Sequence, residues 1–136
     1  ELYCYFARGA PCLISGFNLN TSKGLCNNTA GTLHSITVDA DEQQHVQTMI
    51  ENAAAGTIIL LQNAPVSVNV AFAQMDASTW PEDETLVPGQ VVIPISPSKH
   101  PSEFYTGKNS DKLKLHCYQT GVELAFAFTP EKVRNI

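Results

Sequence analysis

Hydrophobic and polar residues alternate along much of the chain with the period of two that is typical of β-strands. The clearest example is 66–71, where three valines are interleaved with Ser67, Asn69 and Ala71, so we expect a half-buried strand there. Other short runs are apolar or alternate in the same way. They predict further strands at 2–7, 12–15, 32–38, 57–61, 91–95, 113–118 and 122–129.

One segment has the period of a helix. Its apolar side chains recur at i, i+3, i+4 and i+7, at Val46, Met49, Ile50 and Ala53. Asp39, with Glu42 three residues later, matches an acidic capping box. Gly56 stands where a glycine commonly ends a helix. The pattern predicts a helix over about 39–55 whose apolar face packs on the core.

The segments 16–31, 74–89 and 96–111 are rich in residues that favour loops, such as Gly, Asn, Pro, Ser and Asp. The sequence therefore predicts a mainly β protein with one α-helix. Short strands at this spacing are typical of a small barrel or a curled sheet. The apolar strands at the two ends favour a buried position in the sheet of a larger neighbour.

Composition narrows the classes of protein that fit. The 136 residues carry a net charge of −5 and only 15% are charged, which favours a packed domain over a disordered one. A self-sufficient nucleic-acid binder is usually basic, so the acidic net charge counts against that class. The apolar run Ile58–Leu61 is far shorter than the ~20 residues that span a membrane, so no membrane partner is expected. The four cysteines form no CxxC pair, which favours reduced thiols in an intracellular protein.

Motif searches predict no catalytic residue, cofactor site or metal site in this chain. It contains no GxxxxGK[ST], GxSxG, HExxH or GxGxxG. The acidic residues at 39–42 are explained by helix capping, and those at 82–84 by a solvated loop. An exposed Trp80 could stack on a base, but we expect it to pack its loop onto the core.

The segment 7–33 resembles the Pif/RecD-type superfamily 1 DNA helicases, including the helicase-like proteins of Helitron-type transposons. The family pattern starts with Gly-Ala-Pro, as in Gly9–Pro11, and continues into an Asn/Gly loop. The matching loop positions are Asn18, Leu19, Gly24, Leu25, Asn27, Gly31 and Leu33. Asn28 replaces a family glycine, and Asn tolerates the left-handed conformation better than most residues.

A second segment is similar to another family motif, a buried strand that leads into a helix. Val122–Thr129 reads VELAFAFT and agrees closely with that strand, and Lys132 agrees farther on. The chain departs from the family's His, Gln and Gly within Pro130–Asn135. The two segments occur in the family's order.

The resemblance implies a fold and a division of the chain. Residues 1–33 would be a strand and the Asn/Gly loop of the second RecA-like α/β domain. Residues 34–118 would form an inserted small barrel of Src-homology-3-like form with one helix, and 119–136 would return to the RecA-like domain. Because the chain opens at Glu1 rather than Met, we expect a fragment.

The resemblance also implies a function. The chain would be part of the C-terminal half of an ATP-dependent DNA helicase of repair or recombination, nuclear in location, that handles single-stranded DNA without hydrolysing ATP. ATP and Mg would bind the helicase ATPase domains, which would be partners of this chain. The implied nucleic-acid-binding residues are Asn18, Lys23, Asn27, Thr129 and Lys132.

Other interpretations stay open. The departures within Pro130–Asn135 favour a degenerate transposon-derived β module that acts in protein interaction or has no function. An unrelated soluble enzyme is a third possibility, but no catalytic constellation supports it. At the level of residues, Asn18 and Asn27 are equally consistent with turn formation, and Lys23 with a solvated loop charge.

Overall fold

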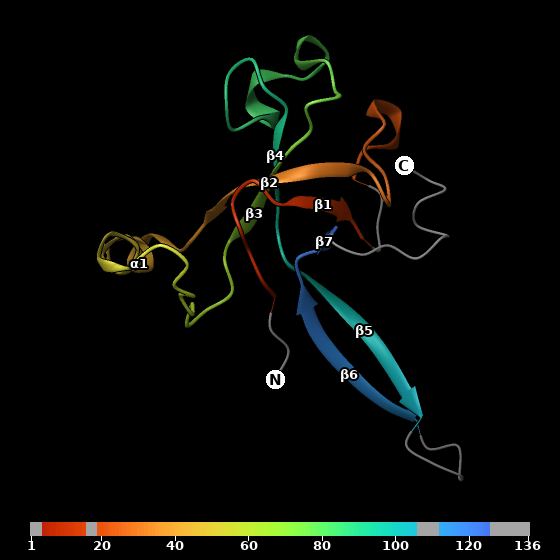
Figure 1. The fold of residues 1–136 in the computed structure, drawn as a ribbon. Helices are drawn as coiled ribbons and strands as arrows, with labels where there is room; N and C mark the ends of the chain where they lie inside the picture. The colour runs from red at the N-terminus through yellow and green to blue at the C-terminus, as the bar shows by residue number, and fades with distance from the viewer. Residues whose placement is uncertain (1–3, 16–18, 106–111, 126–136) are drawn as a thin grey trace.

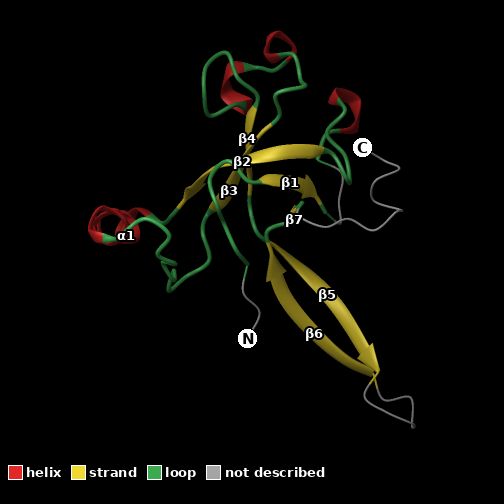
Figure 2. Ribbon diagram, viewed as in Figure 1, coloured by secondary structure: helices red, strands yellow, loops and turns green. Residues whose placement is uncertain are grey.

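A computed structural model describes residues 4–15, 19–105 and 112–125, with the backbone alone for 99–105 and 112–119 (Figure 1). The strands are β1 (Pro11–Ile14), β2 (Ala30–Thr37), β3 (Ser67–Ala71), β4 (Val92–Ile95), β5 (Ser98–Tyr105), β6 (Lys112–Gln119) and β7 (Val122–Leu124). The helices are α1 (Ala40–Asn52) and the single-turn 3-10 helices η1 (Thr21–Lys23), η2 (Ala77–Thr79) and η3 (Glu82–Glu84) (Figure 2). The expected class, mainly β with one α-helix, is confirmed.

Five of the strands form one antiparallel sheet in the order β4-β3-β2-β1-β7. β1 to β4 are neighbours in sequence and in space, as in a meander. β7 comes from the far end of the chain and pairs with the free side of β1. The end strands β1 and β7, for which a larger and separate sheet was expected, therefore share one sheet with β2, β3 and β4.

β5 and β6 form a separate hairpin that projects from the sheet (Figure 1). Their register runs from Ser98 opposite Gln119 to Tyr105 opposite Lys112. Within the described residues no ladder joins β4 to β7, so the expected closed barrel is corrected to an open sheet. The reason is that the chain leaves β4 for this hairpin, whose two strands hydrogen-bond to each other.

Most expected strands are confirmed, with small shifts at their ends. Two are wrong: residues 4–7 and 57–61 are not strands. The run 57–61 pairs with no described strand, and Ile58 and Leu60 are 79% and 66% exposed. β5 lies where a loop was expected, because its proline and polar residues are typical of a loop. Among the described strands it is an edge strand that pairs with β6.

The helix begins as expected, since the Asp39 side chain accepts a hydrogen bond from the Asp41 amide at 3.2 Å. It ends at Asn52 rather than near Gly56, because Ala53 is already extended. The expected core-facing stripe is only partly correct. Val46 is buried but Ile50 is 51% exposed, since α1 lies to one side of the sheet (Figure 2).

The hydrophobic core lies on one face of the sheet. Opposed residues of β2, β3 and β4, such as Leu33, Val70 and Ile93, place their side chains on that face. Loop residues complete it from the other side, notably Leu25, Phe72 and Trp80. The two connections that carry these loop residues, β1–β2 and β3–β4, are thereby fixed against the sheet.

Candidate functional site

The pairing of β1 with β7 brings together the segments 7–33 and 122–129, which the sequence analysis singled out. Cys12 lies opposite Leu124 and Ile14 opposite Val122. The ladder is extended at both ends, by the Ala125 amide donating to the Pro11 carbonyl at 2.9 Å and by the Ser15 amide donating to the Gly121 carbonyl at 2.8 Å. The Ser15 hydroxyl also donates to the Glu123 carboxylate at 2.6 Å. Ser15 and Glu123 are 108 positions apart in the sequence. The two segments are thus neighbours in the fold.

The described part of the Asn/Gly loop, residues 19–29, is held by its own hydrogen bonds. The Asn20 and Leu25 backbones donate to each other, both at 2.8 Å, and enclose η1. The Asn20 side chain accepts from the Lys23 amide at 3.3 Å, which caps the turn. Leu25 is fully buried in the core. The loop therefore has a defined shape that the sheet supports.

The turn at 26–29 contains Asn27. The Cys26 amide donates to the Thr29 hydroxyl at 2.9 Å, and the Asn28 amide donates to the Ile14 carbonyl at 2.8 Å. Asn28 has a φ of 68°, so the expected left-handed conformation at the family's glycine position is confirmed. Asn27 therefore lies within a hydrogen-bonded turn, which fits its interpretation as a turn-forming residue.

Lys23 links the loop to the β3–β4 connection. Its Nζ lies 2.7 Å from Glu84 Oε2 and 4.5 Å from the centroid of the Trp80 ring. Trp80 is 8% exposed, which confirms that it packs its loop onto the core. Lys23 is therefore a paired, partly covered cation rather than a solvated loop charge, and Glu84 is engaged rather than merely solvated.

The structure describes two of the five implied nucleic-acid-binding residues. Lys23 and Asn27 lie on the same loop, on either side of the buried Leu25. Asn18, Thr129 and Lys132 lie outside the described residues. The Glu84 contact was missed because Lys23 and Glu84 are 61 positions apart, so no local signal in the sequence links them.

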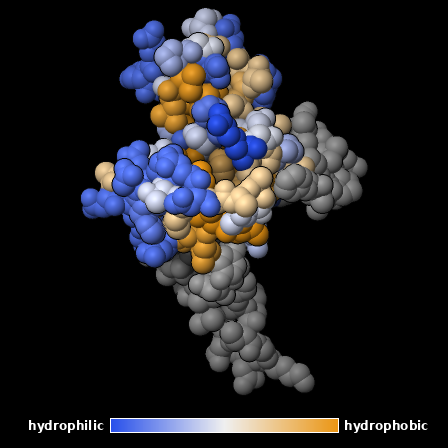
Figure 3. Space-filling view, turned by 60° about the vertical axis from the view of Figure 1, so that its left-hand side comes forward, coloured by the Kyte–Doolittle hydropathy of each residue, from blue (hydrophilic) through white to orange (hydrophobic). Residues whose placement is uncertain are grey.

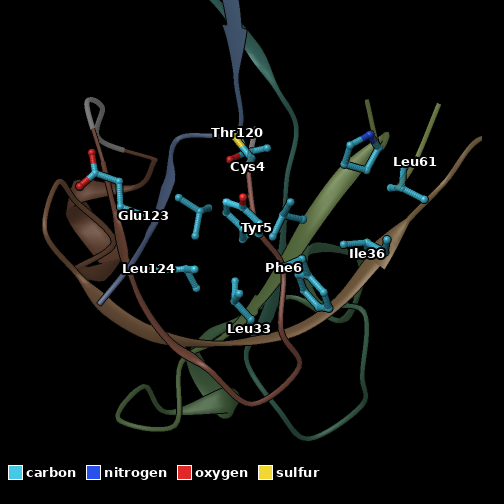
Figure 4. Close-up of a pocket in the computed structure, with 12 residues that line it drawn as sticks. Cys4, Tyr5, Phe6, Leu33, Ile36, Leu61, Thr120, Glu123 and Leu124 are labelled. Atoms are coloured by element: carbon cyan, nitrogen blue, oxygen red, sulfur yellow. The ribbon is translucent and has the colours of Figure 1, made fainter. Parts of the chain in front are cut away.

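A cavity of about 280 Å³ was also missed by the sequence interpretation. The sheet contributes apolar side chains to its wall, at Leu33, Ile36, Val68, Val122 and Leu124. Tyr5 and Phe6 cross it from the N-terminal segment, and Leu61 closes one side (Figure 4). Its lining is mostly apolar, with Thr120 and Glu123 as its polar members, which suits an apolar group that carries a polar end. The aromatic pair near the N-terminus was its only trace in the sequence.

The opposite face of the sheet carries a buried polar network centred on Asn69, which is 2% exposed. Its Nδ2 donates to Ser35 Oγ at 2.9 Å and to Thr37 Oγ1 at 3.1 Å, while its Oδ1 accepts from Ser67 Oγ at 2.8 Å. Among the described residues no buried side-chain polar atom lacks a partner. The network satisfies itself, so its role is to fix β2 against β3.

The titratable groups whose side chains the structure describes do not converge on a reaction centre. Burial raises the pKa of the Cys12 thiol to about 11, which keeps it protonated. Hydrogen bonds from Ser78 lower the pKa of Asp76 in an exposed turn. In the part of the chain that the structure describes, no three His, Cys, Asp or Glu side chains gather as a metal site, and no helix is long and apolar enough to cross a membrane.

Comparisons with protein-family models, with curated protein sequences and with solved structures gave no match.

Proposed function

We propose that this chain is a β module from the C-terminal half of a Pif-type DNA helicase, which holds single-stranded DNA while other domains hydrolyse ATP. The observation that supports it most is the β1–β7 ladder, with Cys12 opposite Leu124. This ladder places two segments side by side, one from each end of the chain, and the two resemble successive motifs of the family. A shared strand-binding surface needs both segments in one place.

The Asn/Gly loop supplies the chemistry of this proposal. Lys23 offers an ammonium group for a phosphate, and Asn27 an amide of the kind that contacts phosphate or sugar oxygens. Such contacts hold a strand without reading its sequence. The loop is already ordered by the Asn20–Leu25 bonds and the buried Leu25, so little conformational entropy is lost on binding.

The proposal includes the domain assignment implied by the resemblance. Residues 1–33 and 119–136 belong to a second RecA-like domain. The inserted residues 34–118 add β3 and β4 to the same open sheet instead of closing a separate barrel. ATP and Mg bind to ATPase domains elsewhere in the complete protein, which acts in the nucleus. The net charge of −5 makes the isolated chain a weak and salt-sensitive binder.

The experiment is fluorescence anisotropy of labelled oligonucleotides titrated with the whole chain. We expect similar affinities for oligo-dT and a mixed sequence. The logarithm of affinity should fall with that of salt by about 0.7 for each phosphate contact. Lys23→Ala should lower this slope, whereas Arg8→Ala removes an equal charge from an exposed residue outside the loop. Failure of the wild-type chain to bind at low salt, or equal effects of the two variants, would overturn the proposal.

A second candidate function, a protein-interaction module, is favoured by the exposed apolar residues. Tyr5, Ile58 and Leu60 are 65%, 79% and 66% exposed, and Tyr5 also lines the cavity. Figure 3 shows apolar side chains at the surface, bordered by polar ones. Exposed apolar clusters are typical of protein contact sites. A chain that binds no DNA but self-associates in sedimentation, and loses this with Ile58→Asp, would support it.

A further inference from the structure

We infer that Glu84 occupies, on Lys23, the position that a DNA phosphate takes, so that the acidic turn η3 restrains DNA binding by the Asn/Gly loop. The inference rests on the proposed function and adds a regulatory contact to it. It starts from the ion pair between Lys23 Nζ and Glu84 Oε2, which are 2.7 Å apart. A carboxylate and a phosphate present the same kind of anionic oxygen to an ammonium group.

The fold delivers Glu84 to Lys23. The buried Trp80 anchors the start of the turn, and the Glu84 amide donates to the Pro81 carbonyl at 3.0 Å. Just after it, the Leu86 amide donates to the Val92 carbonyl at 3.0 Å. The carboxylate therefore reaches the loop from a turn that is tied to the sheet on both sides.

Trp80 holds the ammonium group in place independently of Glu84. Lys23 Nζ lies 4.5 Å from the centroid of the indole ring, within the range of a cation–π interaction. Loss of the Glu84 contact leaves this interaction intact. The cation therefore stays on the loop, ready for a phosphate.

The ion pair is accessible and easily exchanged. The side chains of Lys23 and Glu84 are 23% and 45% exposed. Ion pairs near the surface contribute little net free energy, because solvent screens them and the side chains lose entropy. A phosphate that arrives with neighbouring contacts can displace the carboxylate. Glu82 and Asp83 on the same turn add repulsion toward the approaching strand.

The test is the same anisotropy titration with Glu84→Gln, which removes the charge and keeps the size of the side chain. We expect about two- to fivefold tighter binding, the range set by a surface ion pair. Glu82→Gln is the matched control, since it removes an equal charge from the same turn and should change affinity less. Equal effects of the two variants would overturn the inference.

A double-mutant cycle separates the ion pair from general charge effects. If Glu84 acts through Lys23, Glu84→Gln has no more effect than Glu82→Gln in a Lys23→Ala background. A gain in that background as large as in the wild-type background would contradict the inference. Trp80 is the only tryptophan, so its fluorescence during urea unfolding confirms that each variant is folded.

The outcomes also separate this inference from the proposed function. Binding by the wild-type chain with equal gains from Glu84→Gln and Glu82→Gln removes the restraint and keeps the function. Binding by the wild-type chain that Glu84→Gln tightens more than Glu82→Gln supports both. Absence of binding by every folded variant at low salt removes both.

Discussion

Gly31 lies where β2 leaves no room for a side chain against β3 and the residue after it, and replacing it with alanine tests the described packing directly. A Cβ at this position would lie 2.5 Å from Val70 Cγ1, 3.0 Å from the Ala71 carbonyl oxygen and 3.0 Å from Phe72 Cε1. Val70 and Phe72 are fully buried, and the carbonyl belongs to the backbone of the neighbouring strand. None of the three atoms can move without disturbing the ladder or the core.

The size of the effect follows from two opposing terms. Overpacking of a core costs about 1–3 kcal/mol. Gly-to-Ala replacement gains about 0.4–1 kcal/mol through the unfolded chain. We therefore expect Gly31→Ala to lower the free energy of unfolding by about 1–2 kcal/mol. With a urea m-value of about 1.5 kcal/mol per M, the midpoint falls by about 1 M.

Urea unfolding followed by Trp80 fluorescence measures this change. The Val70→Ala background provides the control, because it removes Cγ1, the closest of the three contacts. Gly31→Ala should then cost less than it does in the wild-type chain. An unchanged or raised midpoint for Gly31→Ala, or equal costs in the two backgrounds, would refute the close approach of β2 and β3.

Three further predictions concern groups on other parts of the sheet and its loops. Asn69→Ala leaves the buried Ser67 hydroxyl without its acceptor and breaks the bonds to Ser35 and Thr37, so it should lower the free energy of unfolding by about 1–3 kcal/mol in urea titrations; an unchanged midpoint would contradict the network. Burial raises the pKa of Cys12 to about 11, so in the native chain Cys12 should react with a thiol reagent far more slowly than the exposed Cys4, as peptide mass mapping would show; equal rates would count against its burial. Hydrogen bonds from Ser78 lower the pKa of Asp76 below its ordinary 3.8. The ionised group therefore stabilises the fold above pH 3.8, and this contribution is lost as the pH falls through the lowered pKa. Acid unfolding should be less steep in Asp76→Asn than in the wild-type chain, and identical curves would refute this.

Local features of this fold could be predicted from local residues. Alternation at 66–71 places β3, the Asp39 side chain caps α1, and Asn28 takes the left-handed conformation that its residue type permits. Each of these depends on neighbours within a few positions. The same is true of Trp80, whose size and apolar ring favour burial in any packed loop.

The predictions that failed concern features that depend on distant parts of the chain. The run 57–61 has the composition of a strand, but it is one only if another edge lies beside it. The apolar stripe of α1 predicts which face of the helix packs on the core, but not how much of that face the sheet covers. The Lys23–Glu84 pair and the cavity arise from segments that only the complete fold brings together. The periodicity of hydrophobic residues does not predict which distant segments come into contact.

The position of β7 also determines the order in which the sheet can be completed. β1 can pair with β2 as soon as both exist, but its other side waits for a strand more than a hundred residues later. Contacts of such high sequence separation slow folding, because the connecting chain must first be ordered. During synthesis the outer side of β1 stays an unpaired edge until β7 emerges. In that interval the nascent chain is most prone to pair with another copy of itself.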